Sequence, residues 1–204
     1  MEGGFYAIID PAHCGGRSPV DVAHQVLSGG AAVLQLRMKT GTDRERVALA
    51  RALRELTRTA RVPFVMNDRA DLALLVDADG LHLGQDDLSI ADARRLLGAR
   101  QLGVSTHDLA QAREAEREGA DLIGFGPVFD TATKERPDPT VGLGTLAEVC
   151  RAVRIPVVAI GGLTAERAVQ AYDAGATWVA AISAVTASQD VAASARGFVP
   201  GAGR

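Results

Sequence analysis

The sequence predicts a single (β/α)8 barrel, also called a TIM barrel, over residues 1–204. Short apolar runs alternate with amphipathic segments, the alternation occurs eight times, and each unit is about 25 residues long, as in a small barrel of this class. An open doubly wound sheet is the alternative. That fold would need fewer strands and a G-x-G-x-x-G nucleotide motif after the first strand, and the sequence has no such motif there.

The apolar runs are rich in Val, Ile and Leu, which is typical of strands buried on both faces of a parallel sheet. They cover residues 5–10, 32–39, 63–68, 80–85, 101–107, 121–129, 156–162 and 178–183. The segments between them begin with helix-start signals. These signals are Ser18 before Pro19, the capping box Thr42 to Glu45, Ser89 before Ile90, and Thr164 before Ala165.

The composition indicates small molecules as partners. The chain is 47% hydrophobic and 4% aromatic, with a formal net charge of -3 and no basic block, so it lacks the features that bind nucleic acids. No apolar run reaches membrane-spanning length and residues 1–6 do not resemble a signal peptide, so we expect no membrane contact and a cytoplasmic location. Cys14 and Cys150 are interpreted as free thiols. Self-association into a homo-oligomer is compatible with this composition.

Lysine is rare in this chain. Lys39 and Lys134 are the only lysines among 22 basic Lys and Arg residues, and lysine is a compact charge suited to phosphate or amine chemistry. Lys134 lies in the long stretch GPVFDTATKERPDPTVGLG, residues 126–144. Long loops in compact domains usually serve a function, so we expect an active-site loop at about 130–142. Residues 198–204 are expected to form a disordered tail.

In such a barrel, the active site is built at the carboxyl ends of the strands. The second predicted strand ends in Gln35, Arg37 and Lys39, which a period of two places on one face. The alternative is an ordinary strand end whose cations reach solvent. Because an inward row of polar groups is costly to bury without an anionic partner, we expect an anion here.

Two carboxylates follow the next two strands. Asp68 ends the third strand and Asp87 follows the fourth. If they converge to about 5 Å, they repel each other by roughly 3 kcal/mol, and a hard cation such as Mg²⁺ would relieve that repulsion. The alternative is that each residue only caps a helix.

The remaining strand ends supply phosphate-binding candidates. Ser105, at the end of the fifth strand, could donate to a phosphate but has no partners for a nucleophilic triad. His82 is interpreted as a packing or surface residue, and His107 as a neighbour of the site. Gly162 and Ser183 follow the seventh and eighth strands, where these barrels frequently bind phosphate.

Seven motifs, in order along nearly the whole chain, resemble the thiamine phosphate synthase family. They are QLRMK, MNDR, GLHLGQDD, GVSTH, GPVFDTATK, AIGGL and AISAV. The resemblance implies a transferase of thiamine biosynthesis that joins hydroxymethylpyrimidine diphosphate to hydroxyethylthiazole phosphate, giving thiamine phosphate and diphosphate. It also implies Mg²⁺-assisted loss of diphosphate, followed by attack of the thiazole nitrogen on the pyrimidine methylene group.

The resemblance assigns a role to each matching residue. The residues assigned to the pyrimidine diphosphate are Gln35, Leu36, Arg37, Met38, Lys39, Asn67, Ser105 and Lys134. Those assigned to the thiazole phosphate are Thr131, Ala132, Thr133, Gly162, Ile182 and Ser183, and those assigned to Mg²⁺ are Asp68 and Asp87. The residues expected to be catalytic are Arg37, Lys39, Ser105 and Lys134. Many family members have Glu at the place of Met38 and at that of Asp86, and neither difference removes an assigned ligand.

Three other functions remain open from the sequence. A thiazole tautomerase of the same superfamily is the nearest, although one branch of it has histidine where this chain has Pro127. A Schiff-base aldolase could use Lys134, but its lysine should lie within a strand. A phosphate-binding protein without activity is the third, and only turnover would separate it from an enzyme.

Overall fold

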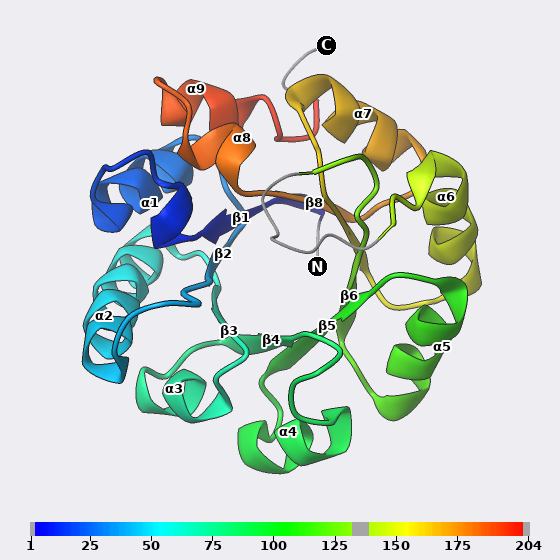
Figure 1. Ribbon diagram of the computed structural model, residues 1–204, viewed down its shortest axis with the longest axis horizontal. Coiled ribbons are helices and arrows are strands. Elements are labelled where there is room, and N and C mark those ends of the chain that lie inside the picture. The colour runs from blue at the N-terminus through cyan, green and yellow to red at the C-terminus, as the bar shows by residue number, and fades with distance from the viewer. Residues whose placement is uncertain (1–2, 132–138, 202–204) are drawn as a thin grey trace.

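Eight parallel strands close into a barrel in the order in which they occur in the chain (Figure 1). The computed structural model describes residues 3–131 and 139–201. The strands are β1 (Gly4–Ile9), β2 (Val33–Leu36), β3 (Phe64–Asn67), β4 (Gly80–Leu83), β5 (Gln101–Thr106), β6 (Leu122–Phe125), β7 (Val157–Ile160) and β8 (Trp178–Ala181). β8 pairs with β1, with Tyr6 opposite Ala180. The predicted TIM barrel is confirmed.

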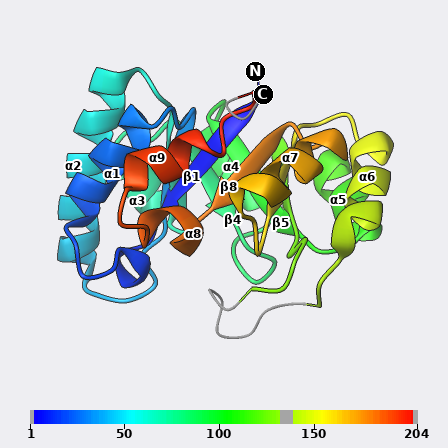
Figure 2. The same ribbon diagram turned by 90° about the horizontal axis from the view of Figure 1, so that it is seen from above.

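Helices surround the strands (Figures 1 and 2). They are α1 (Pro19–Ser28), α2 (Asp43–Ala60), α3 (Ala70–Leu75), α4 (Ile90–Leu97), α5 (Leu109–Glu118), α6 (Gly142–Ala152), α7 (Ala165–Asp173), α8 (Ser183–Thr186) and α9 (Val191–Arg196). The predicted caps are confirmed: the side chains of Ser18, Thr42, Ser89 and Thr164 each accept a backbone N–H of the following helix. None of the described helices is long and apolar enough to cross a membrane.

Short helices that the apolar pattern of the sequence did not indicate follow the first and the last strand. A 3-10 helix, η1 (Pro11–His13), follows β1, and the last unit has two short helices, α8 and α9, where one was expected. The rings of Phe198 and Phe5 lie 5.1 Å apart between centroids, and Phe198 is buried. The prediction of a disordered tail from residue 198 is therefore wrong at Phe198, because this ring packs against β1.

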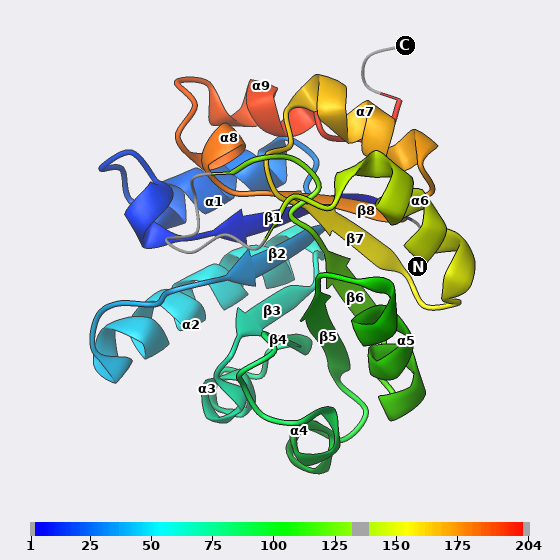
Figure 3. The same ribbon diagram turned by 45° about the vertical axis from the view of Figure 1, so that its right-hand side comes forward.

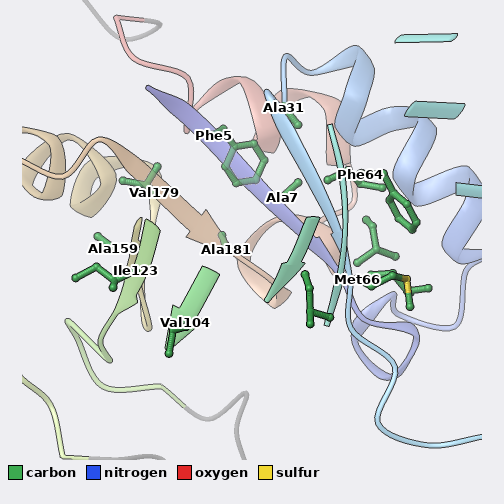
Figure 4. Packing of buried hydrophobic residues seen from close by; sticks show 14 of the residues in the cluster. Phe5, Ala7, Ala31, Phe64, Met66, Val104, Ile123, Ala159, Val179 and Ala181 are labelled. Atoms are coloured by element: carbon green, nitrogen blue, oxygen red, sulfur yellow. The ribbon is translucent and has the colours of Figure 1, made fainter. Parts of the chain in front are cut away.

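Buried side chains form two layers, because alternate residues of each strand face opposite sides. The outer layer fills the space between strands and helices, and Figure 4 shows Phe5, Phe64, Met66 and Val104 within it. The inner layer fills the barrel itself. Its buried members are Tyr6, Ile8, Val33, Val65, Leu122, Val158, Trp178 and Ala180.

The same alternation places polar side chains above the inner layer. Gln35 follows Val33 on the inward face of β2, and Asn67 follows Val65 on β3. Figure 3 shows the strands side by side, with the helices outside them. All eight strands are parallel, so their carboxyl ends meet at one mouth of the barrel, and this is where the polar groups lie.

Candidate active site

A cavity of about 620 Å³ opens at the mouth of the barrel, and every strand or the loop after it contributes to its lining. The predicted site residues that line it are Gln35, Arg37, Lys39, Asn67, Asp68, Asp87, Ser105, Thr131, Gly162, Ile182 and Ser183. The tertiary structure thus brings together side chains from opposite sides of a closed barrel. The predictions for Ala132, Thr133 and Lys134 lie outside the described residues.

Two residues of the predicted diphosphate site do not line the cavity. Leu36 is 1% exposed and belongs to the outer layer, and Met38 packs partly buried against the same layer. Alternation along β2 turns Leu36 away from Gln35, and Met38, which lies past the end of this strand, packs on the same outer side. The assignment of Leu36 and Met38 to the pyrimidine diphosphate, which rests on the family resemblance, stays a prediction.

Tyr6 of β1 and Asp10, which follows this strand, hold the polar side chains at the end of β2. The Gln35 amide donates to the Tyr6 hydroxyl at 2.9 Å, and the Arg37 guanidinium donates to the carboxylate of Asp10. Asp10 is 3% exposed, and its other oxygen accepts the backbone N–H of Ala12 at 3.1 Å. The orientation of Arg37 at the cavity is therefore set by a buried carboxylate. Asp10 was not predicted from the sequence, where its signal is an acidic residue directly after an apolar strand.

Replacing Asp10 by Asn should destabilise the fold while leaving the main-chain trace intact. Asn keeps an acceptor for Ala12 but removes the charge that pairs with Arg37. A hydrogen bond to a charged group contributes about 1.5–3 kcal/mol, so we expect the free energy of unfolding, measured in urea, to fall by about that amount. Glu114→Gln breaks the exposed pair with Arg117 and should change it by less than about 1 kcal/mol. Equal changes in the two variants would contradict this account of Asp10.

Asp68 and Asp87 meet at the mouth of the cavity. Burial raises the pKa of Asp68 above its ordinary value; the hydrogen bond from Lys39 lowers it, and the neighbouring Asp87 carboxylate raises it further. The Lys39 ammonium contacts Asp68 directly, and Asp87 accepts the N–H of Gly84 at 2.7 Å. The two carboxylates are neighbours, as the effect of Asp87 on the pKa of Asp68 shows. Neither residue serves as the side-chain cap of the helix that follows it.

This carboxylate pair suits a hard divalent cation. Within the described ranges, no group of three or more His, Cys, Asp or Glu side chains could hold a metal ion, so a cation here would take most of its ligands from elsewhere. Mg²⁺ behaves in this way, because it usually binds one or two protein carboxylates and completes its shell with water and phosphate oxygens. The donor set of Asp68 and Asp87 fits Mg²⁺ and suits zinc poorly.

Ser105 lines the cavity beside His82, which the sequence led us to interpret as a packing or surface residue. The two side chains are linked by a hydrogen bond of 3.0 Å between His82 Nε2 and Ser105 Oγ. Enclosure of the imidazole lowers the pKa of His82 to about 4, so the ring is neutral at pH 7. The sequence does contain a signal for this contact: alternation along β4 places His82 on the same face as Gly84, and both residues line the cavity.

Glycines shape the opposite side of the cavity. Gly162 has a φ of 63°, and a Cβ built on it would lie 2.4 Å from the carbonyl oxygen of Asp130. Only glycine therefore fits this close approach of the loops after β6 and β7. Ile182 and Ser183, which follow β8, line the cavity next to this glycine turn.

Comparisons with known proteins agree with this geometry. A family model described as thiamine monophosphate synthase matches residues 5–185. The thiamine-phosphate synthase of Chloroflexus aurantiacus is 47% identical over 192 residues, which cover 94% of this chain and 89% of the relative. That of Roseiflexus castenholzii is 46% identical, over 96% of this chain and 86% of the relative. A solved structure, thiamine phosphate pyrophosphorylase from Pyrococcus furiosus, has a TM-score of 0.88 and 36% identity, covering 95% of this chain and 92% of that one.

Proposed function

This chain belongs to the thiamine monophosphate synthase family, and we propose that its cavity binds hydroxymethylpyrimidine diphosphate and hydroxyethylthiazole phosphate side by side and joins them. The products are thiamine phosphate and diphosphate, and the enzyme is a transferase of thiamine biosynthesis. The observation that carries the proposal is the division of one cavity. Cations and paired carboxylates lie at the ends of β2 to β4, and a glycine turn lies across the barrel after β7.

The reaction needs charge stabilisation more than a nucleophile. The bond between the pyrimidine methylene carbon and the diphosphate oxygen breaks, and its electron pair leaves with the diphosphate. The electron-rich aminopyrimidine stabilises the resulting cation, and the lone pair of the thiazole nitrogen then forms the new C–N bond. The protein has to neutralise the leaving group, position two rings and exclude water.

The side chains at the ends of β2 to β5 suit the diphosphate. Arg37 and Lys39 supply two positive charges, and Asn67 and Ser105 supply uncharged donors. Asp68 and Asp87 would hold Mg²⁺, which would neutralise negative charge on the diphosphate oxygens when bound. Lys134 is assigned to the leaving diphosphate by the family resemblance alone.

The loops after β7 and β8 suit the thiazole phosphate. Backbone N–H groups can approach an anion where glycine removes the side chain, and Gly161 and Gly162 both have positive φ values of 97° and 63°. Ser183 adds a hydroxyl at the same side of the cavity. Thr131, which the family resemblance assigns to the thiazole phosphate, lines the same cavity from the loop after β6.

The test of the proposed function is a thiochrome fluorescence assay with the purified protein. We expect thiamine phosphate only when pyrimidine diphosphate, thiazole phosphate and Mg²⁺ are all present. Product formed without the diphosphate ester would contradict the proposal. A tautomerase would isomerise the thiazole alone, but Pro127 lines the cavity where a branch of that group has histidine.

Replacing Gly162 by Ala should affect the thiazole phosphate more than the pyrimidine diphosphate. The added Cβ would lie 2.4 Å from the oxygen of Asp130, so the turn after β7 must shift. We expect the KM for thiazole phosphate to rise about tenfold or more, equivalent to about 1.4 kcal/mol of lost binding, with a smaller change for the pyrimidine. Steady-state kinetics with each substrate varied in turn measures both. Equal changes would contradict the division of the cavity.

A further inference from the structure

The His82 ring is confined inside the barrel by two glycines on the next two strands, β5 and β6. A Cβ built on Gly103 of β5 would lie 2.6 Å from His82 Nδ1, and one built on Gly124 of β6 would lie 3.1 Å from Cε1. The register explains this contact, since His82 pairs with Gly103 and Ser105 pairs with Gly124. The imidazole therefore occupies space that any other residue at these two positions would fill.

The two ring nitrogens of His82 have different surroundings. Nε2 lies 3.0 Å from Ser105 Oγ, whereas Nδ1 is buried and has no hydrogen-bond partner among residues 3–131 and 139–201. A hydrogen on Nδ1 would be a buried donor without an acceptor, and buried N–H groups of that kind are costly and rare. A lone pair on Nδ1 costs less. Hydrogen bonding thus assigns the ring proton to Nε2.

This tautomer sets the role of the serine. With the proton on Nε2, His82 donates to Ser105 Oγ, and the serine hydroxyl must direct its own hydrogen elsewhere. The backbone oxygen of Ser105 already accepts the Gln85 amide at 2.5 Å. Because the Ser105 side chain lines the cavity, its hydrogen is available to a bound molecule.

We propose that His82 is a positioning residue that makes the Ser105 hydroxyl a hydrogen-bond donor toward an acceptor atom of the pyrimidine diphosphate. The identity of that substrate rests on the proposed function. The tautomer of His82 does not, since it follows from contacts within the barrel. The two parts can therefore be tested separately.

The tautomer is tested by ¹⁵N NMR on histidine-labelled protein without substrates. Of the four histidines, His82 is assigned by the signal that disappears in His82→Gln. We expect Nε2 to carry the hydrogen and Nδ1 to show the shift of an unprotonated ring nitrogen. An Nδ1–H tautomer would overturn the proposal, whether or not the protein makes thiamine phosphate.

The effect on the reaction is tested by two replacements of His82. A glutamine amide can place an N–H close to the position of Nε2, whereas phenylalanine fills the space without a donor. We expect His82→Phe to raise the KM for pyrimidine diphosphate or lower kcat by about two- to tenfold, the range of one hydrogen bond, and His82→Gln to restore most of the loss. The KM for thiazole phosphate should not change. Unchanged kinetics in His82→Phe would overturn the proposal.

A double-mutant cycle shows whether His82 acts through the serine. In a Ser105→Ala background, His82→Phe should have little further effect, because the group that it positions is already absent. A full additional loss would mean that His82 acts on its own, and would overturn the proposal. If wild-type protein makes no thiamine phosphate, the proposed function fails, while the NMR result still decides the tautomer.

Displacing the ring without removing it gives a further test. Gly103→Ala would push against His82 Nδ1 and the Leu122 side chain, at 2.6 and 3.0 Å, and should raise the KM for pyrimidine diphosphate as His82→Phe does. Gly144→Ala is the matched control, since a Cβ on this residue of α6 would meet nothing within 4 Å. Wild-type kinetics in a folded Gly103→Ala variant would contradict the confinement of the ring.

Discussion

Asp87→Asn should lower kcat/KM at saturating Mg²⁺ by about 10²- to 10³-fold, the usual effect of removing one charge-stabilising group from an active site. Asn keeps an oxygen that can accept the N–H of Gly84, now at 2.7 Å from the carboxylate, so the loop after β4 should stay in place. The negative charge beside Asp68 is lost, and with it one of two carboxylates available to Mg²⁺. Steady-state kinetics over a range of Mg²⁺ concentrations should show weaker activation by the metal.

The thermal stability of Asp87→Asn should not fall with its activity. Asp87 adds to the raised pKa of Asp68, so removing one of two like charges should leave the melting temperature in a chelator equal to or above that of the wild type. Asp86→Asn is the matched control, because Asp86 lines the same cavity and is not part of the Asp68–Asp87 pair. The kcat/KM of this control should change less than about tenfold, equivalent to about 1.4 kcal/mol. Wild-type activation by Mg²⁺ in Asp87→Asn would rule out a metal role for this residue.

Lys39→Ala should reduce kcat by about 10²- to 10³-fold with little effect on folding. The ammonium stands at the proposed position of the leaving diphosphate, so its contribution should be greater in the transition state than in the ground state. Its pair with Asp68 is partly open to solvent, with side-chain exposures of 53% and 20%, and such pairs contribute at most about 1 kcal/mol to stability. Single-turnover kinetics and urea unfolding measure the two effects.

Lys39→Arg separates the charge of Lys39 from its shape. Arginine keeps the positive charge but presents it on a planar fork, so we expect only part of kcat to return. Arg95→Ala is the control, because Arg95 is 81% exposed in its side chain and pairs only with Asp92 among the described residues. If Lys39→Ala retained full kcat, Lys39 would be an ordinary strand end that reaches solvent.

Much of the barrel follows from local sequence patterns. Runs of apolar residues of strand length, separated by capped helices, were enough to predict all eight strands, because burial on both faces leaves a continuous apolar pattern. The inward row of Gln35, Arg37 and Lys39 was also predictable: all three line the cavity, although Arg37 and Lys39 lie past the end of β2 at Leu36. Strand alternation places Leu36 in the outer layer, and Met38, included like Leu36 through the family resemblance, packs against the same layer.

The sequence by itself determined the fold class, the helix caps and the polar strand ends; the contacts between strands required the tertiary structure. Asp10 and Arg37 are 27 positions apart and His82 and Ser105 are 23 apart, and no local pattern relates either pair. Their partnerships depend on the pairing of consecutive strands, β1 with β2 and β4 with β5, and on the strand register, which places His82 opposite Gly103. A shift of one residue in a strand would turn each of its side chains to the other face, so these contacts form only when the two strands of each pair meet in the observed register.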